Sequence, residues 1–127
     1  MTDEQRAALL ALAERCEATT GPDSKLERDI AFAIMPDSPK KNRQVRGIEY
    51  APPAAPFTAS IDAALTLVPD PKFYVLDERP KSDGRHTVTA WVGWWTNSET
   101  WAKTDTVEAA MPALALCAAA LRARAAQ

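Results

Sequence analysis

Histidine and cysteine, which carry much of catalytic and metal-binding chemistry, are rare in this chain, and their spacing matches no common site. His86 is the sole histidine. It could act as a base near neutral pH, but beside a turn a solvated role is the simpler interpretation. Cys16 and Cys117 lie far apart in the sequence. One histidine and two distant cysteines cannot supply the four ligands of a common zinc site.

Acidic residues gather around one predicted turn, where they could hold a cation. Asp77 and Glu78 precede the turn, and Asp83 lies within it. Adjacent residues of a strand point to opposite faces, so Asp77 and Glu78 do not converge on one ion. The chain has four glycines and contains neither a phosphate-binding glycine motif nor a nucleophile elbow. We therefore expect no metal, no cofactor and no catalytic site.

All four tryptophans lie in one stretch, "AWVGWWTNSETW" at 90–101. Such a cluster is compatible with core packing, with a contact surface for a partner protein and with stacking on a ligand or base. Trp95 and Trp101 fall near the end of a predicted strand and in a polar loop. We expect these two to be exposed, and they are our candidate residues for a protein–protein contact.

A basic cluster lies in the run "KKNRQVR". If this cluster is simply a solvated loop, no function is needed to explain it. If it contacts phosphates, it would bind nucleic acid by neutralising the phosphate charges. The net charge of −2 and the pI of about 5.4 show no basic excess over the whole chain. Nucleic-acid binding through this loop is therefore the alternative hypothesis, and its candidate residues are Lys40, Lys41, Arg43 and Arg46.

The length suits one domain over 1–127, which begins with a helical segment at 1–35. Apolar residues at helical spacing predict a helix over 3–18. The sequence "TTGPD" then interrupts the pattern, and a second helix, capped by Asp23 or Ser24, follows and ends at a proline. Both cysteines lie on apolar helical stripes, Cys16 here and Cys117 near the C-terminus, so we expect them to be free, buried thiols.

The rest of the chain divides into a proline-rich basic loop at 36–56 and a mixed segment at 57–127. Within the loop, "VRGIEY" could form a short edge strand. The mixed segment begins with a helix opened by Thr58 or Ser60. Two strands follow, "KFYVLDE" and "HTVTAWVGWW", joined as an antiparallel hairpin by an Asp-Gly turn. A last helix runs from about Met111 to Ala125, with a proline in its first turn.

The second of these strands is apolar on both faces, because valines and an alanine alternate with tryptophans and a glycine. In a sheet with one solvent-exposed face, apolar and polar residues would instead alternate along each strand. We therefore predict an α/β (α+β) fold, an α-β-α sandwich in which a small, mainly antiparallel sheet lies between helical layers. Trp91 and Trp94 should then be mostly buried, one in each layer.

Two helical motifs carry a resemblance to a known family. The stretches "FTASIDAALTLVP" at 57–69 and "AAMPALALCAAALRARA" at 109–125, together with the earlier "KLERDIAFAI", resemble the phage ABA-sandwich domain family. The resemblance implies α-β-α layering. It also implies a small bacteriophage or prophage protein without established activity, and it supplies no catalytic motif.

These observations together predict a non-enzymatic phage or prophage accessory protein that acts by protein–protein contacts. Inhibition of a host defence system, of the anti-CRISPR type, is one concrete form of this function. No segment approaches the ~20 apolar residues of a membrane span, and the acidic start with a short, interrupted apolar run does not fit an export signal. We therefore expect a host or phage protein as partner, no membrane, and the cytoplasm of the bacterial host.

Overall fold

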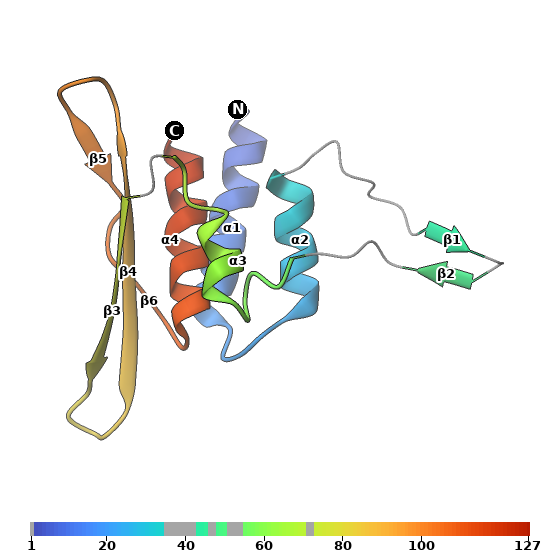
Figure 1. Cartoon of the computed structure of the whole chain (residues 1–127), viewed down its shortest axis with the longest axis horizontal. Helices are drawn as coiled ribbons and strands as arrows, with labels where there is room; N and C mark the ends of the chain where they lie inside the picture. The colour runs from blue at the N-terminus through green and yellow to red at the C-terminus, as the bar shows by residue number, and fades with distance from the viewer. Residues whose placement is uncertain (1, 35–42, 46–47, 51–54, 71–72) are drawn as a thin grey trace.

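The structure is a computed structural model, and it describes residues 2–34, 43–45, 48–50, 55–70 and 73–127 (Figure 1). Helices and strands alternate irregularly along the chain. In sequence order they are α1 (Asp3–Ala18), α2 (Ser24–Ile34), β1 (Arg43–Val45), β2 (Ile48–Tyr50), α3 (Ile61–Leu65), β3 (Phe73–Pro80), β4 (His86–Trp95), β5 (Trp101–Lys103), β6 (Val107–Ala109) and α4 (Pro112–Ala126).

The main sheet is antiparallel and is built around β4. Its partner β3 pairs with it from Phe73↔Gly93 to Pro80↔His86, which confirms the predicted hairpin. Gly84 in the connecting turn has a φ of 85°, a conformation that glycine adopts without strain. On the opposite edge of β4, β5 pairs near its end and β6 near its start. The sequence did not predict these two strands of three residues each.

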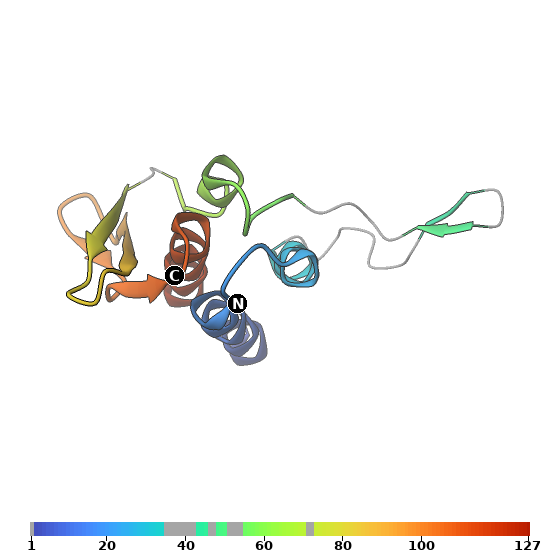
Figure 2. The same cartoon turned by 90° about the horizontal axis from the view of Figure 1, so that it is seen from below.

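Helix α4 lies at the centre of the core, with the sheet on one side and α1 on the other (Figure 1, Figure 2). Most of its residues from Ala113 to Ala125 are buried, including those that point away from the sheet. A helix that is apolar all round has to be buried, and alanine side chains let neighbouring elements approach from several sides. The predicted final helix is confirmed, with Pro112 in its first turn.

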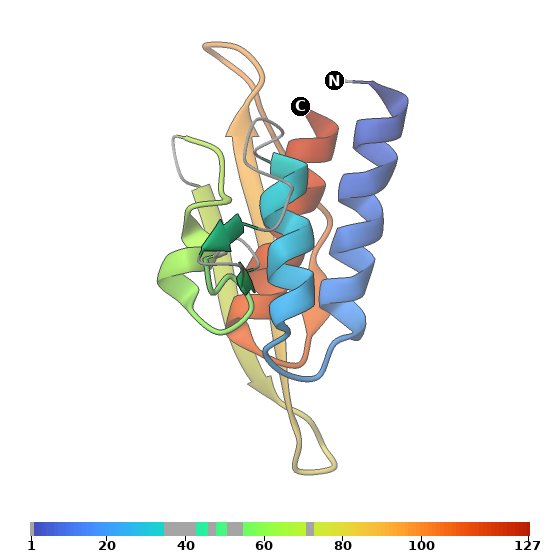
Figure 3. The ribbon, with the colours of Figure 1, turned by 90° about the vertical axis from the view of Figure 1, so that its right-hand side faces the viewer.

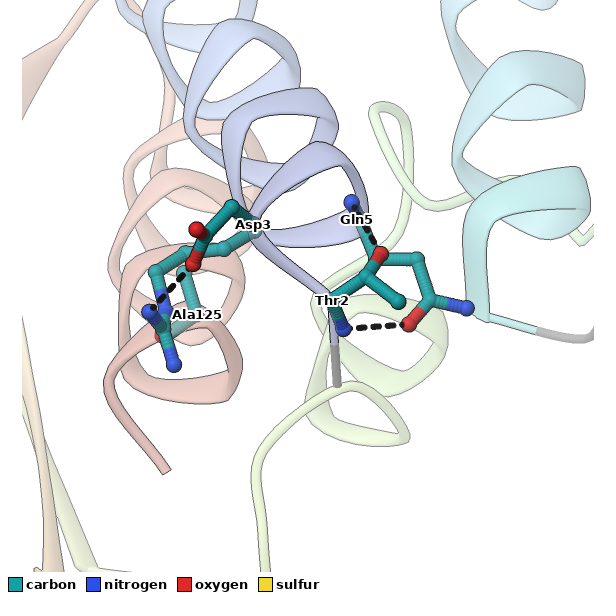
Figure 4. Close-up of polar contacts among 5 residues, drawn as sticks. Thr2, Asp3, Gln5 and Ala125 are labelled. Carbon is teal, nitrogen blue, oxygen red and sulfur yellow. Dashed lines mark hydrogen bonds and ion pairs between the residues drawn. The ribbon is translucent and has the colours of Figure 1, made fainter.

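Helix α1 confirms the prediction for 3–18 and is tied to the end of α4. Its start carries a reciprocal cap in which the backbone N–H of Gln5 donates to Thr2 Oγ1 at 3.1 Å (Figure 4). The backbone N–H of Thr2 donates in turn to Gln5 Oε1 at 2.9 Å. One turn on, Arg6 Nε donates to the carbonyl oxygen of Ala125 at 2.8 Å. An arginine of α1 thereby satisfies a carbonyl that α4 leaves open at its C-terminus.

A buried threonine connects the start of α2 to the segment before α3. Asp23, rather than Ser24, caps α2, because its carboxylate accepts the backbone N–H three residues on at 3.0 Å. The fully buried Thr58 hydroxyl accepts the Asp23 backbone N–H at 2.9 Å and donates to Glu27 Oε2 at 2.7 Å. Ser60, the second of the two predicted candidates, is the N-cap of α3.

The α+β class and the small antiparallel sheet are confirmed, but the layering differs from the predicted sandwich. The helices in contact with the sheet lie on one of its faces, as Figure 1 and Figure 3 show. Val88, Ala90 and Val92 face them and are buried. Trp91 and Trp94 lie on opposite faces and are each partly buried, but only Trp94 packs against the core. No second helical layer forms within the described residues.

In the basic loop, β1 and β2 form a two-stranded antiparallel hairpin, with Arg43↔Tyr50 and Val45↔Ile48 as its outer and inner pairs. The predicted short strand at 45–50 is therefore two strands that pair with each other. The hairpin lies apart from the helices and the main sheet in Figure 1 and Figure 2. Among the helices of the described residues, none is both long and apolar enough to cross a membrane.

Candidate functional site

The open face of the main sheet carries a set of apolar side chains, which we call the aromatic face. Residues paired across neighbouring strands point to the same side, so the register places Val75 beside Trp91, and Trp95 beside Trp101. The aromatic face is made up of Phe73, Val75, Trp91, Trp95 and Trp101. Four of these are among the exposed large hydrophobic residues: Phe73 at 40%, Val75 at 43%, Trp95 at 47% and Trp101 at 53%.

The rings of the aromatic face support one another in two pairs. Phe73 and Trp95 meet edge to face, with centroids 5.9 Å apart and planes at 77°. Trp91 and Trp101 are also 5.9 Å apart, tilted by 36°. Both pairs fall in the range where aromatic rings attract. The four rings line a shallow pocket of about 180 Å³, which we call the aromatic pocket.

A glycine in β4 makes room for one of these rings. A Cβ atom built on Gly93 would lie 3.1 Å from two ring carbons of Trp101 and 3.3 Å from the Ala102 carbonyl oxygen. Trp101 therefore lies directly over the backbone at Gly93. Aromatic cover of a strand glycine is a known way of stabilising an otherwise weak position in a sheet.

A positive charge lies beside the aromatic pocket. Lys103 lies opposite Gly93 on the same face of the sheet, and its Nζ is 5.2 Å from the centroid of the Trp91 ring, a cation–π contact. Further along this face, Asp77 forms an ion pair with Arg79, in which Arg79 Nε lies 2.6 Å from Asp77 Oδ2. Among the described residues, a ligand at the pocket would therefore meet aromatic rings and Lys103.

The predicted interaction residues Trp95 and Trp101 are brought together and are exposed, as expected. Trp101 does not lie in a loop, because it begins β5 and pairs directly with Trp95. Sequence reasoning missed Phe73, Trp91 and Lys103 as members of the same surface. The period-two spacing of Phe73 and Val75, and of the tryptophans in β4, was the available signal, but it fits a buried face equally well.

The basic cluster cannot be placed against this surface. Lys40, Lys41 and Arg46 lie outside the described residues, and Arg43 begins β1 with a side chain that the structure does not describe. The side chain of His86, at the start of β4, is likewise outside the description. Nucleic-acid binding through this loop stays a prediction.

Both cysteines are free and fully buried, as predicted. They come from the packed helices α1 and α4, and the Cys117 thiol donates to the carbonyl oxygen of Phe57 at 3.0 Å. Its contact with Cys16, and then its burial, raise the pKa of Cys117 above the ordinary value of a thiol. A protonated, inaccessible thiol is a poor nucleophile.

The acidic residues around the hairpin turn stay apart from one another. Asp83 pairs with Arg85 at 3.3 Å, while Asp77 pairs with Arg79. In the part of the chain that the structure describes, no group of three or more His, Cys, Asp or Glu residues could hold a metal ion. The aromatic face is therefore the candidate functional site.

Comparisons of the chain with protein-family models, with curated proteins and with solved structures find no match. The resemblance to the phage ABA-sandwich domain family accordingly stays a prediction. The role of the aromatic face has to be inferred from its own geometry and chemistry.

Proposed function

We propose that this protein is a non-enzymatic binding module whose aromatic face contacts a partner protein. The observation that carries the proposal is the exposure of Trp95 and Trp101, about half uncovered and side by side on a sheet face that no helix of the described residues covers. Tryptophan is enriched among the residues that dominate binding energy at interfaces. Contiguous exposed apolar patches of this kind mark interaction sites on many monomeric proteins.

The exposed area of the aromatic face is large enough to form the apolar centre of a protein–protein interface. At the ~150–250 Å² that an aromatic side chain can bury, the exposed fractions of Phe73, Trp95 and Trp101 leave on the order of 300 Å² uncovered. A standard interface buries about 800 Å² on each partner. The aromatic face would thus supply the apolar centre, and the exposed polar loop at 96–100 with Lys103 would supply part of the rim.

The chemistry of the surface favours binding over catalysis. Among the described residues, the side chains that line the aromatic pocket include no nucleophile and no titratable group. Lys103, which carries a charge beside the pocket, already lies over the Trp91 ring. The buried Cys117 thiol is held by the Phe57 carbonyl inside the core, away from this surface.

The biological setting in this proposal comes from the resemblance to the phage ABA-sandwich domain family. It supports a phage or prophage accessory protein in the cytoplasm of the bacterial host. The partner would be a host or phage protein, and inhibition of a host defence system of the anti-CRISPR type is the concrete form we favour. Nucleic-acid binding through the loop at 40–46 is the competing hypothesis.

Affinity capture from host cells, infected and uninfected, tests the proposal. The wild-type chain is compared with the Trp95→Ala, Trp101→Ala double variant. The matched control is Ile61→Ala, because Ile61 on α3 is 41% exposed and lies outside the aromatic face. We expect one partner to be retained by the wild type and by Ile61→Ala and to be lost from the double variant. Equal retention by all three proteins would contradict the proposal, provided that circular dichroism shows each to be folded.

A further inference from the structure

The outer edge of β3 borders the aromatic face and has no strand beside it. Each of the eight residues of β3 pairs with a residue of β4, without a bulge. Among the described residues, no strand pairs with the other side of β3. An edge of this kind presents unpaired backbone groups, which are a template for a strand from another chain.

The pairing with β4 determines which backbone groups reach the open edge. The Val92 N–H donates to Thr104 Oγ1 at 3.0 Å, and the Val92 carbonyl oxygen accepts the Thr104 N–H at 2.9 Å, so both groups of Val92 point away from β3. In an antiparallel ladder, opposite residues either exchange both bonds or direct both groups away from each other, and the two kinds of pair alternate. Tyr74 lies opposite Val92. The N–H and C=O groups of Tyr74 and of Leu76 therefore point to the open edge, where no hydrogen bond of the described residues uses them.

The first half of β3 is an apolar edge without the usual protection. Phe73, Tyr74 and Val75 are among the exposed large hydrophobic residues. Tyr74 is 40% exposed although its pairing with the buried Val92 places it on the helical face, so the helices do not reach this edge. Charged residues and proline, which commonly protect an edge, are confined to the second half of β3, where three charged residues precede Pro80.

The open edge can supply what the aromatic face lacks as an interface. The aromatic face leaves on the order of 300 Å² uncovered, whereas a standard interface buries about 800 Å² on each partner. The lining of the aromatic pocket is almost entirely apolar, whereas an interface typically carries about ten direct hydrogen bonds. The edge of β3 adjoins this face through Phe73 and Val75, and it offers backbone donors and acceptors.

We propose that an extended segment of the partner protein pairs with the outer edge of β3 and lengthens the main sheet by one strand, an inference that rests on the proposed function. Addition of a strand to an exposed sheet edge is an established recognition mode, in which backbone bonds give affinity and alternate side chains give specificity. Alternate side chains of the added strand would extend the aromatic face beside Phe73, and the others would cover Tyr74. The segment should therefore be rich in β-branched and aromatic residues.

Other occupants match the edge less well. The backbone groups within a helix are already bonded inside the helix, and a proline has no N–H to donate to the Tyr74 carbonyl oxygen. A second copy of β3 is also a poor match. The antiparallel registers that use most of β3 place Asp77 opposite either Val75 or the Asp77 of the other copy, and like charges directly opposite each other are destabilising.

The variants Tyr74→Pro and Tyr74→Ala form a matched pair that tests the inference. Both remove the ring, but only proline removes the N–H at the open edge, and β4 does not use that N–H. The probe is a short peptide of valine and threonine with lysine at each end for solubility, titrated into the full chain and followed by tryptophan fluorescence. We expect saturable binding to the wild type, and binding to Tyr74→Pro about tenfold weaker than to Tyr74→Ala. A peptide with proline at every second position should not bind.

Amide hydrogen exchange shows whether the peptide lies at the proposed edge. In the free chain, the amides of Tyr74 and Leu76 should exchange quickly, whereas the Val75 amide, which bonds to β4, should exchange slowly. The peptide should slow exchange at Tyr74 and Leu76. Circular dichroism and slow exchange at Val75 check that Tyr74→Pro keeps the sheet intact. Absence of peptide binding, or equal affinity of Tyr74→Pro and Tyr74→Ala, would overturn the inference.

The outcomes separate this inference from the proposed function. If peptide binding fails, and capture of a partner protein still requires Trp95 and Trp101, the inference is overturned and the proposed function stands. If the peptide protects the Tyr74 amide, and capture does not require the two tryptophans, the proposed function is overturned and strand addition at the edge stands. A dimer in sedimentation that Tyr74→Pro abolishes and Tyr74→Ala retains would assign the edge to a second copy of the chain, which would overturn the inference.

Discussion

The position of Trp101 over Gly93 predicts an energetic coupling that a double-mutant cycle can measure. The cycle combines Gly93→Ala with Trp101→Ala. In the wild type, a new Cβ would lie 3.1 Å from two ring carbons of Trp101, whereas carbon atoms in favourable contact are ~3.5–4.0 Å apart. The ring therefore has to move by about half an ångström, which it can do because Trp101 is 53% exposed.

Two opposing effects set the magnitude. Replacing glycine by alanine within a strand stabilises the fold by roughly 0.5–1 kcal/mol. Displacing the Trp101 ring loses part of its contact with Trp91 and with the backbone, and an aromatic pair is worth about 0.5–1.5 kcal/mol. We expect Gly93→Ala to change the free energy of unfolding by less than about 1 kcal/mol in the wild type. When Trp101→Ala has removed the ring, the same change should stabilise the protein by roughly 0.5–1 kcal/mol.

Urea denaturation of the four proteins, followed by far-ultraviolet circular dichroism, measures the coupling. The 3.3 Å approach of the new Cβ to the Ala102 carbonyl oxygen is present with and without the Trp101 ring, so it cancels in the cycle. A coupling energy of about 0.5–1.5 kcal/mol is the expected result. If Gly93→Ala has the same effect in both backgrounds, the Trp101 ring does not lie over Gly93, and the description of the aromatic pocket fails with it.

Three further predictions concern the core, the thiols and the basic loop. Thr58→Val should lower the free energy of unfolding by ~2–4 kcal/mol, because a hydroxyl bonded to a carboxylate and to a backbone N–H is lost; a loss below 1 kcal/mol in urea denaturation would refute this. Cys16 and Cys117 should react with a thiol reagent slowly when native and quickly in denaturant, since both are buried and the pKa of Cys117 is raised; rapid native labelling would show an accessible thiol. We expect no duplex DNA binding near physiological salt. Binding with a log–log salt slope of roughly −3 to −4, flattened by charge reversal at Lys41 and Arg43, would support the competing hypothesis.

Much of the fold was predictable because local signals decide it. Apolar residues at helical spacing and a break at "TTGPD" identified α1 and α2, and an Asp-Gly pair between apolar runs identified the hairpin. Strands β5 and β6 were missed because three residues cannot show a period of two. Their pairing with β4 comes from tertiary context, such as the bond from the Val92 backbone N–H to the buried Thr104 hydroxyl at 3.0 Å.

The layering was not predictable, because a strand with apolar residues on both faces can be buried on both faces or can leave one apolar face exposed. A strand with apolar residues on both faces is typical of a buried strand. In this protein Phe73 packs against Trp95, and Trp95 pairs with Trp101, on a face that no helix of the described residues covers. The sequence indicated that Trp95 and Trp101 are exposed, but not that Phe73 and Trp91 complete a pocket with them. That assembly depends on the register between β3, β4 and β5, which spacing within a single strand does not determine.

The position of the core supports the proposal that the aromatic face acts in binding. Helix α4 is buried along nearly its whole length against the sheet, α1 and α3, so the fold has its apolar centre on the helical side. Trp95 and Trp101 each keep about half of their surface in water and thus realise only part of the stabilisation that a buried tryptophan provides. Smaller polar residues at these positions would leave the buried core intact and would lower the risk of aggregation. Their presence on a face that no helix of the described residues covers therefore supports the proposed contact with a partner. Loss of binding without loss of folding is accordingly the expected behaviour of the double variant.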